Sequence, residues 1–162
     1  MTVLVIGLGH EDRGDDAIGP VVAAGVSAQV PPGVEVVAHE DPMDLVLHWG
    51  DRSWAVVVDA VVSGADPGTL TVLELGADGP GARDWSRLAL GGTHAFGLGE
   101  AVELSRVLGR LPERVTLVGV EAADVTPGAD LTPEVARAVP VAVECVRSLL
   151  ETAVLGGVHV PR

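Results

Sequence analysis

The side chains of this chain that could perform chemistry are mainly carboxylates and histidines. The 162-residue sequence contains no lysine, tyrosine or asparagine, and none of its serines occurs in a Gly-x-Ser-x-Gly nucleophile motif. These absences exclude a Schiff-base lysine, a tyrosine acid and a cysteine–histidine–asparagine triad. The single cysteine, Cys145, lies in a helical pattern and is expected to be a packing residue. Asp, Glu, His and Arg remain, and these residue types are typical of a metal site.

The first acidic group lies in the segment Gly7–Gly19, directly after an apolar run. Two adjacent carboxylates, Asp15 and Asp16, occupy the turn that precedes a helical pattern. A dinucleotide-binding turn would need a glycine in place of Asp12, and a phosphate-binding loop would need a lysine. Negative side chains repel phosphate and attract cations. This turn therefore indicates a site for a metal ion or another positively charged group.

Two further polar residues, Asp59 and His94, also lie where they could bind a cation. Asp59 comes directly after the apolar run 54–58, and a carboxylate at the end of a central strand is costly unless it is paired or metal-bound. His94 lies in a glycine-rich segment just before another helical pattern. One imidazole and two carboxylates can bind a borderline divalent ion, with water completing its coordination. Asp16, Asp59 and His94 are therefore the candidate site residues.

Other polar residues near these positions have more than one interpretation. We expect Asp15 to act at the start of the first helix, where acidic side chains are favourable, and Asp16 to turn inward. Glu121 follows the last apolar run and is either part of the site or the cap of a loop. His10 is either a turn residue or an additional ligand.

The elements that must position these residues alternate between strands and helices, which predicts a parallel sheet covered by helices. Too few residues separate the third apolar run from the fourth for a parallel crossover, so the fourth strand should be an antiparallel edge strand. Ligands of open α/β sheets bind beyond the carboxyl ends of the parallel strands, where the candidate residues fall. The expected strands are 3–6, 34–37, 54–58, 69–75 and 115–120, with a long loop over 76–93.

Composition limits the organisation and the partners of the chain. Its length predicts a single α/β domain over residues 1–162. The net charge of −13 argues against nucleic acid and anionic membrane surfaces as partners. No apolar stretch is long enough for a membrane span, and a lone cysteine fits a reducing cytoplasm. Because the outward faces of the predicted helices carry charge, we expect a monomer.

Taken together, the motifs resemble those of the hydrogenase maturation endopeptidases. Each motif is weak alone, but their order and spacing over most of the chain are specific. The resemblance rests on four segments: Gly7–Gly19; 58–60 with 67–70; 93–98; and 117–121 followed by 131–135. This chain has His10 where the family usually has asparagine, and Ala17 where it usually has glycine.

The resemblance implies both a fold and a function. The fold would be a three-layer sandwich, with helices on both faces of a twisted, mostly parallel five-stranded sheet that has one antiparallel edge strand. Asp16, Asp59 and His94 would hold the nickel ion of a [NiFe]-hydrogenase large-subunit precursor, whose C-terminal peptide the enzyme then removes. The nickel would be carried in by the precursor.

Two other functions remain open from the sequence. The same residues would serve a nickel-binding checkpoint or chaperone that docks on the precursor without cutting it. A small hydrolase or phosphorylase on a related sheet is disfavoured, because the motifs contain few basic residues for binding phosphate.

Overall fold

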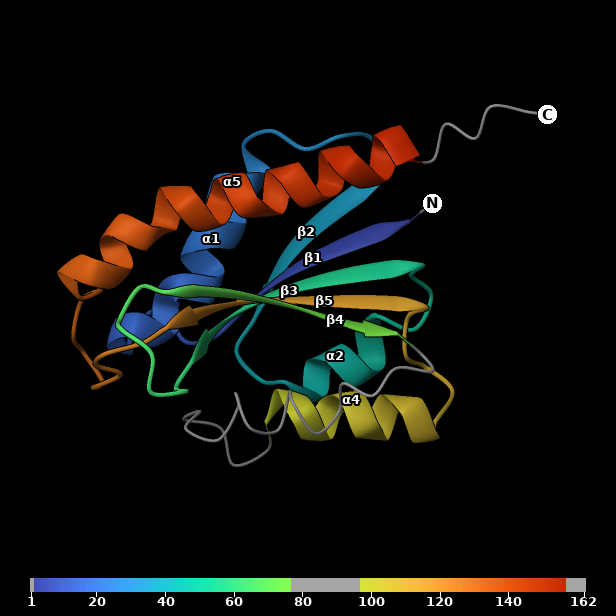
Figure 1. Ribbon diagram of the computed structural model, residues 1–162. Helices are drawn as coiled ribbons and strands as arrows, with labels where there is room; N and C mark the ends of the chain where they lie inside the picture. Colours follow the sequence, from blue (N-terminus) through green and yellow to red (C-terminus); the bar gives the residue numbers. More distant parts are fainter. Residues whose placement is uncertain (1, 77–96, 157–162) are drawn as a thin grey trace.

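The computed structural model describes residues 2–76 and 97–156 (Figure 1). Their strands form one five-stranded sheet in the order β2-β1-β3-β5-β4. Strands β2, β1, β3 and β5 are parallel to one another, and β4 at the edge is antiparallel to β5. The predicted sheet with one antiparallel edge strand is therefore confirmed. The strands are β1 (Val3–Leu8), β2 (Val34–His39), β3 (Trp54–Val61), β4 (Leu70–Gly76) and β5 (Arg114–Glu121).

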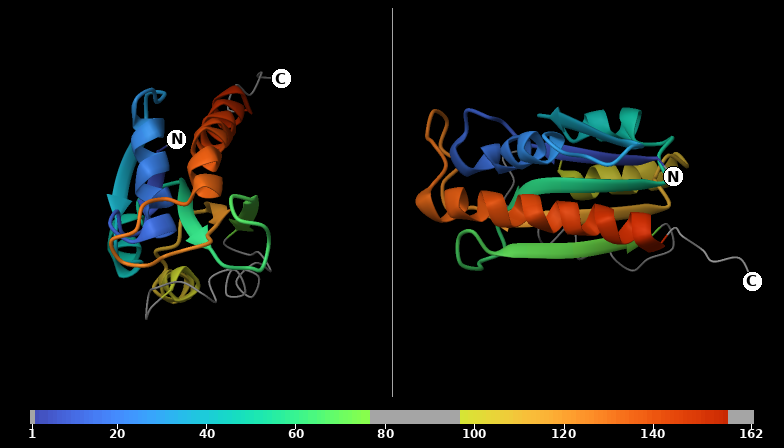
Figure 2. Two further views of the ribbon diagram at one scale, coloured as in Figure 1. Left: turned by 90° about the vertical axis from the view of Figure 1, so that its left-hand side faces the viewer. Right: turned by 90° about the horizontal axis from the view of Figure 1, so that it is seen from above.

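Helices cover both faces of the sheet, as the three-layer prediction requires (Figures 1 and 2). One face carries α1 (Ile18–Ser27) and α5 (Pro133–Gly156), and the other carries α2 (Met43–His48) and α4 (Leu98–Val107). A short 3-10 turn, η1 (Gly14–Ala17), joins the loop after β1 to α1. In the part of the chain that the structure describes, no helix has the length and apolarity of a membrane span.

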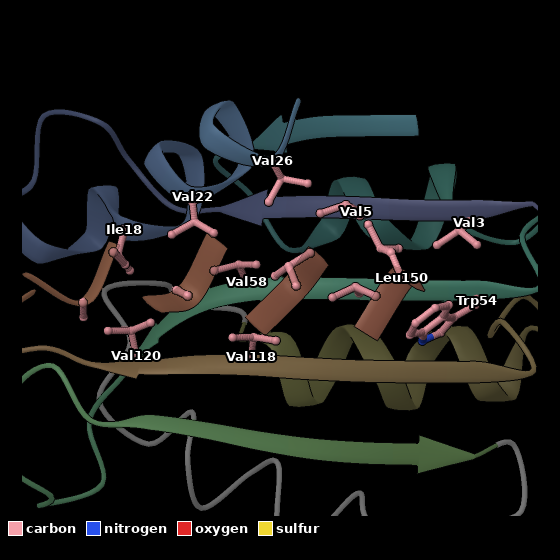
Figure 3. Close-up of a cluster of buried hydrophobic side chains, with 14 of the residues drawn as sticks. Val3, Val5, Ile18, Val22, Val26, Trp54, Val58, Val118, Val120 and Leu150 are labelled. Carbon is pink, nitrogen blue, oxygen red and sulfur yellow. The ribbon is translucent and has the colours of Figure 1, made fainter. Parts of the chain in front are cut away.

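Two apolar cores form because successive side chains of a strand point to opposite faces of the sheet. In β1, Val3 and Val5 pack toward α1 and α5 (Figure 3), whereas Leu4 and Ile6 pack toward α2 and α4. Both sets are buried. Burial on both faces explains why the parallel strands are continuous apolar runs in the sequence.

The carboxyl ends of the parallel strands meet at one edge, seen at the left of Figure 1. The turn η1 and the loop after β5 lie at this edge, and α4 begins there. We expected β3 to end at Asp59, but it continues to Val61. The reason lies in its neighbours: β1 pairs with β3 only as far as Val58, while β5 pairs with it through Val61.

Candidate functional site

The loop after β1 brings the backbone of Gly9 directly against Asp16. A Cβ atom on Gly9 would lie 2.0 Å from the backbone oxygen of Asp16, and the φ angle of Gly9 is +139°. Only glycine fits both the contact and this backbone conformation. In α1, a Cβ atom on Gly19 would lie 2.1 Å from the backbone oxygen of Leu8. These glycines therefore allow η1 and α1 to sit on the end of β1.

Asp16 is buried and its carboxylate contacts His10 twice. The backbone N–H of His10 donates to Asp16 Oδ2 at 2.9 Å, and His10 Nδ1 lies 3.2 Å from the same oxygen. The other ring nitrogen, Nε2, lies 3.8 Å from Glu40 Oε2. Asp16 is therefore turned inward, as predicted, and His10 lies between it and the exposed Glu40.

Asp59 lies on β3, one residue beyond the last pair with β1. Its side chain alternates with that of Val58, so it projects to the same face as Val57, which packs in the core under α2 and α4. Burial raises the pKa of Asp59 well above its ordinary value, and the negative charge of Asp16 raises this pKa further, while a backbone hydrogen bond from Ala60 opposes the shift. A bound cation would relieve this cost, so the two carboxylates fit a metal ion.

His94 falls outside the described residues, so its part in the site stays a prediction. The structure places the N-terminal end of α4, which begins at Leu98, at the edge that holds the two carboxylates (Figure 1). Within residues 2–76 and 97–156, no three His, Cys, Asp or Glu side chains come together as a metal site. The proposed ligand set therefore depends on residue 94 for its third member. The expected loop over 76–93 also lies almost wholly outside the described residues.

The raised pKa of Asp59 predicts a pH-dependent gain in stability for Asp59→Asn. The folded protein keeps the proton on Asp59 to higher pH than the unfolded chain does. The contribution of this group to folding stability is therefore fully present below the ordinary pKa of aspartate, and it is lost as the pH rises through the pKa of Asp59 in the folded protein. Asparagine does not ionise and can still accept the Ala60 hydrogen bond. We expect chelator-treated Asp59→Asn to melt above the wild type at about pH 8, with a difference that shrinks toward about pH 4.

The control for this measurement is Asp51→Asn, the same substitution at an exposed position. Its melting temperature should follow that of the wild type across the pH range, because exposed surface substitutions usually change stability by less than about 0.5 kcal/mol. An Asp59→Asn protein that is less stable than the wild type at about pH 8 would contradict the assignment of Asp59 as a strained buried acid.

Asp15 does not act as we expected. Neither η1 nor α1 has a side-chain cap. Instead the fully buried carboxylate of Asp15 accepts hydrogen bonds from the loop after β5. The backbone N–H groups of Ala123, Asp124 and Thr132 donate to it at 2.8, 3.0 and 2.7 Å, and the Thr132 hydroxyl adds a contact at 2.9 Å. Asp15 therefore fastens the loop to η1, next to Asp16.

Glu121 holds another loop, the one between β3 and β4, by accepting hydrogen bonds from it. Its Oε1 accepts hydrogen bonds from the backbone N–H groups of Ser63 and Gly64, at 2.8 and 3.1 Å, and its Oε2 accepts one from the Ser63 hydroxyl at 2.8 Å. Of the two interpretations left open by the sequence, the loop cap is the one that these contacts support. Sequence reasoning missed Ser63, which carries no motif that would identify it.

Comparisons with known proteins agree with this fold and with the family that the motifs resemble. A family model described as "Hydrogenase maturation protease" matches residues 28–149. Hydrogenase 2 maturation protease of Escherichia coli (strain K12) is 30% identical over 158 residues, which cover 93% of this chain and 91% of that protein. Two solved structures from Escherichia coli, the hydrogenase maturating endopeptidase HybD and a solution structure of an endopeptidase, match with TM-scores of 0.78 and 0.82. Their identities are 27% and 28%, and each match covers 94% of both chains.

The sheet order shows an α/β fold, and these matches identify the chain as a proteolytic enzyme. The chain belongs to the hydrogenase maturation protease family and is an endopeptidase of this type. The family that the sequence motifs indicated is thus confirmed.

Proposed function

We propose that this endopeptidase removes the C-terminal peptide of a nickel-loaded [NiFe]-hydrogenase large-subunit precursor, and that Asp16, Asp59 and His94 bind the nickel. The observation that carries the proposal is the pair of buried carboxylates, Asp16 and Asp59, whose mutual repulsion helps to raise the pKa of Asp59. The name of the curated relative, a hydrogenase 2 maturation protease, supports a hydrogenase precursor as the substrate. In the proposal the enzyme acts as a monomer in the cytoplasm.

The donor set suits nickel because two carboxylates and an imidazole are ligands that a borderline divalent ion accepts. Nickel belongs to the substrate here, since the precursor brings it. Its binding would displace the proton that burial favours on Asp59, so that both carboxylates become anionic together. A precursor without nickel offers no cation to offset these charges. We therefore assign the nickel a recognition role: it makes the loaded precursor the better substrate.

The test is to incubate the enzyme with nickel-loaded and with nickel-free precursor and to follow the mass of the large subunit. Loss of the C-terminal peptide from the loaded form alone is the expected result. Equal cleavage of both forms would contradict nickel recognition. A stable complex with the loaded precursor and no change in its mass would instead identify the non-cleaving checkpoint. The wild-type enzyme with a mature large subunit, which lacks the peptide, is the control for nonspecific cutting.

A further inference from the structure

We propose that His10 is a positioning residue: it holds the Asp16 carboxylate in the orientation that receives the nickel. This inference rests on the function proposed above and adds to it a residue that is not itself a ligand. Its basis is that residue 10 contacts Asp16 Oδ2 through both its backbone N–H and its imidazole.

Two donors on one oxygen fix the rotation of a short side chain. The backbone N–H of His10 lies 2.9 Å from Asp16 Oδ2, and Nδ1 lies 3.2 Å from it. The imidazole donates to this oxygen in the tautomer that carries its hydrogen on Nδ1. A Cβ atom on Gly9 would lie 3.3 Å from the other oxygen, Asp16 Oδ1, so glycine at this position leaves room for the carboxylate. The contacts that fix its orientation are those of residue 10 with Oδ2.

Glu40 lies near the other ring nitrogen of His10. His10 Nε2 lies 3.8 Å from Glu40 Oε2, so the ring lies between one buried and one exposed carboxylate. The Glu40 side chain is 72% exposed, and contacts between exposed charges contribute little. The Asp16 contact is therefore the stronger constraint on the ring. In metal sites, such outer partners fix the orientation of the ligands, and their loss typically lowers affinity or activity by about 10- to 100-fold.

The contacts of the His10 ring favour a positioning role over a direct ligand role. Nδ1 lies 3.2 Å from Asp16 Oδ2, and Nε2 lies 3.8 Å from Glu40 Oε2, so both ring nitrogens face carboxylate oxygens. The sequence leaves His10 open as a turn residue or an additional ligand, and we propose the first, with the added role of orienting Asp16.

Three substitutions of His10 test this inference. In asparagine, the side-chain nitrogen is separated from Cα by the same number of bonds as Nδ1 of histidine, so His10→Asn can restore the contact with Asp16. His10→Ala removes the contact, and His10→Gln places its nitrogen one bond farther away. His39→Ala is the matched control, because His39 Nδ1 lies 3.5 Å from another carboxylate, Asp44 Oδ2, on α2.

The first readout uses the free protein and no substrate. The carboxyl ¹³C resonance of Asp16, assigned by its absence in Asp16→Asn, reports the surroundings of that side chain. We expect it to move in His10→Ala and His10→Gln and to stay near its wild-type position in His10→Asn and His39→Ala. An Asp16 resonance that is unchanged in His10→Ala would overturn the inference, whatever the substrate of the enzyme is.

The second readout is kcat/KM for the nickel-loaded precursor. We expect a loss of about 10- to 100-fold in His10→Ala and recovery in His10→Asn. If His10→Asn were as impaired as His10→Ala, with Asp16 still at its wild-type resonance, the orienting role would be wrong. If the wild type failed to process the precursor, the proposed function would fall, while the resonance of Asp16 would still decide the role of His10.

Discussion

Replacing Asp16 or Asp59 by asparagine is expected to abolish processing of the nickel-loaded precursor while the protein stays folded. Asparagine keeps the volume of the side chain and one acceptor oxygen, so the hydrogen bond from the His10 backbone to residue 16 can persist. What it removes is the negative charge that would hold the cation. Since losing a group that only orients a ligand costs about 10- to 100-fold, losing the ligand itself should reduce the rate by more than about 100-fold. We expect His94→Ala to have the same effect.

The measurement is the initial rate of release of the C-terminal peptide, by mass spectrometry, with circular dichroism to confirm folding. Asp66→Asn is the matched control, because Asp66 is an exposed carboxylate in the loop between β3 and β4. This variant should cleave at the wild-type rate. Full processing by a folded Asp16→Asn or Asp59→Asn protein would refute the proposed nickel-binding site.

The sequence was sufficient to predict the sheet and its edge strand. Apolar runs buried on both faces read directly as strands, and the short connection between β3 and β4 allowed only an antiparallel return. The end of β3 was less accurate, because Asp59 looks like the first residue of a loop. It remains in the strand since β5 continues to pair with it after β1 has ended. Such a boundary depends on a neighbour distant in the sequence.

The roles of the two adjacent aspartates could be predicted only in part. In a 3-10 turn successive side chains point about 120° apart, so Asp15 and Asp16 must face different surroundings. The inward turn of Asp16 followed from its place after the first strand. The hydrogen-bond partners of Asp15 lie more than a hundred positions later in the chain, and no local sequence pattern predicts them. The sequence therefore favoured a helix-end role for Asp15 that the structure contradicts.

Asp15→Ala is expected to cause a large loss of stability, in contrast to the expected effect at Asp16. The buried carboxylate of Asp15 accepts hydrogen bonds from the backbone N–H groups of Ala123, Asp124 and Thr132. Each buried donor left without a partner costs about 1–3 kcal/mol, but the loop can open to water and recover part of that energy. We therefore expect the free energy of unfolding to fall by about 2–4 kcal/mol, measured by urea denaturation.

Two further variants show whether the carboxylate itself is responsible for this loss. Asp15→Asn should not restore stability, because its amide would turn N–H donors toward backbone N–H donors that need an acceptor. Asp12→Ala, at an exposed neighbouring position, should stay within about 0.5 kcal/mol of the wild type. Hydrogen exchange should become faster at the amides of Ala123 and Thr132 in Asp15→Ala. An Asp15→Ala protein with wild-type stability and exchange would show that the loop after β5 is held by other contacts, and that Asp15 does not fasten it to η1.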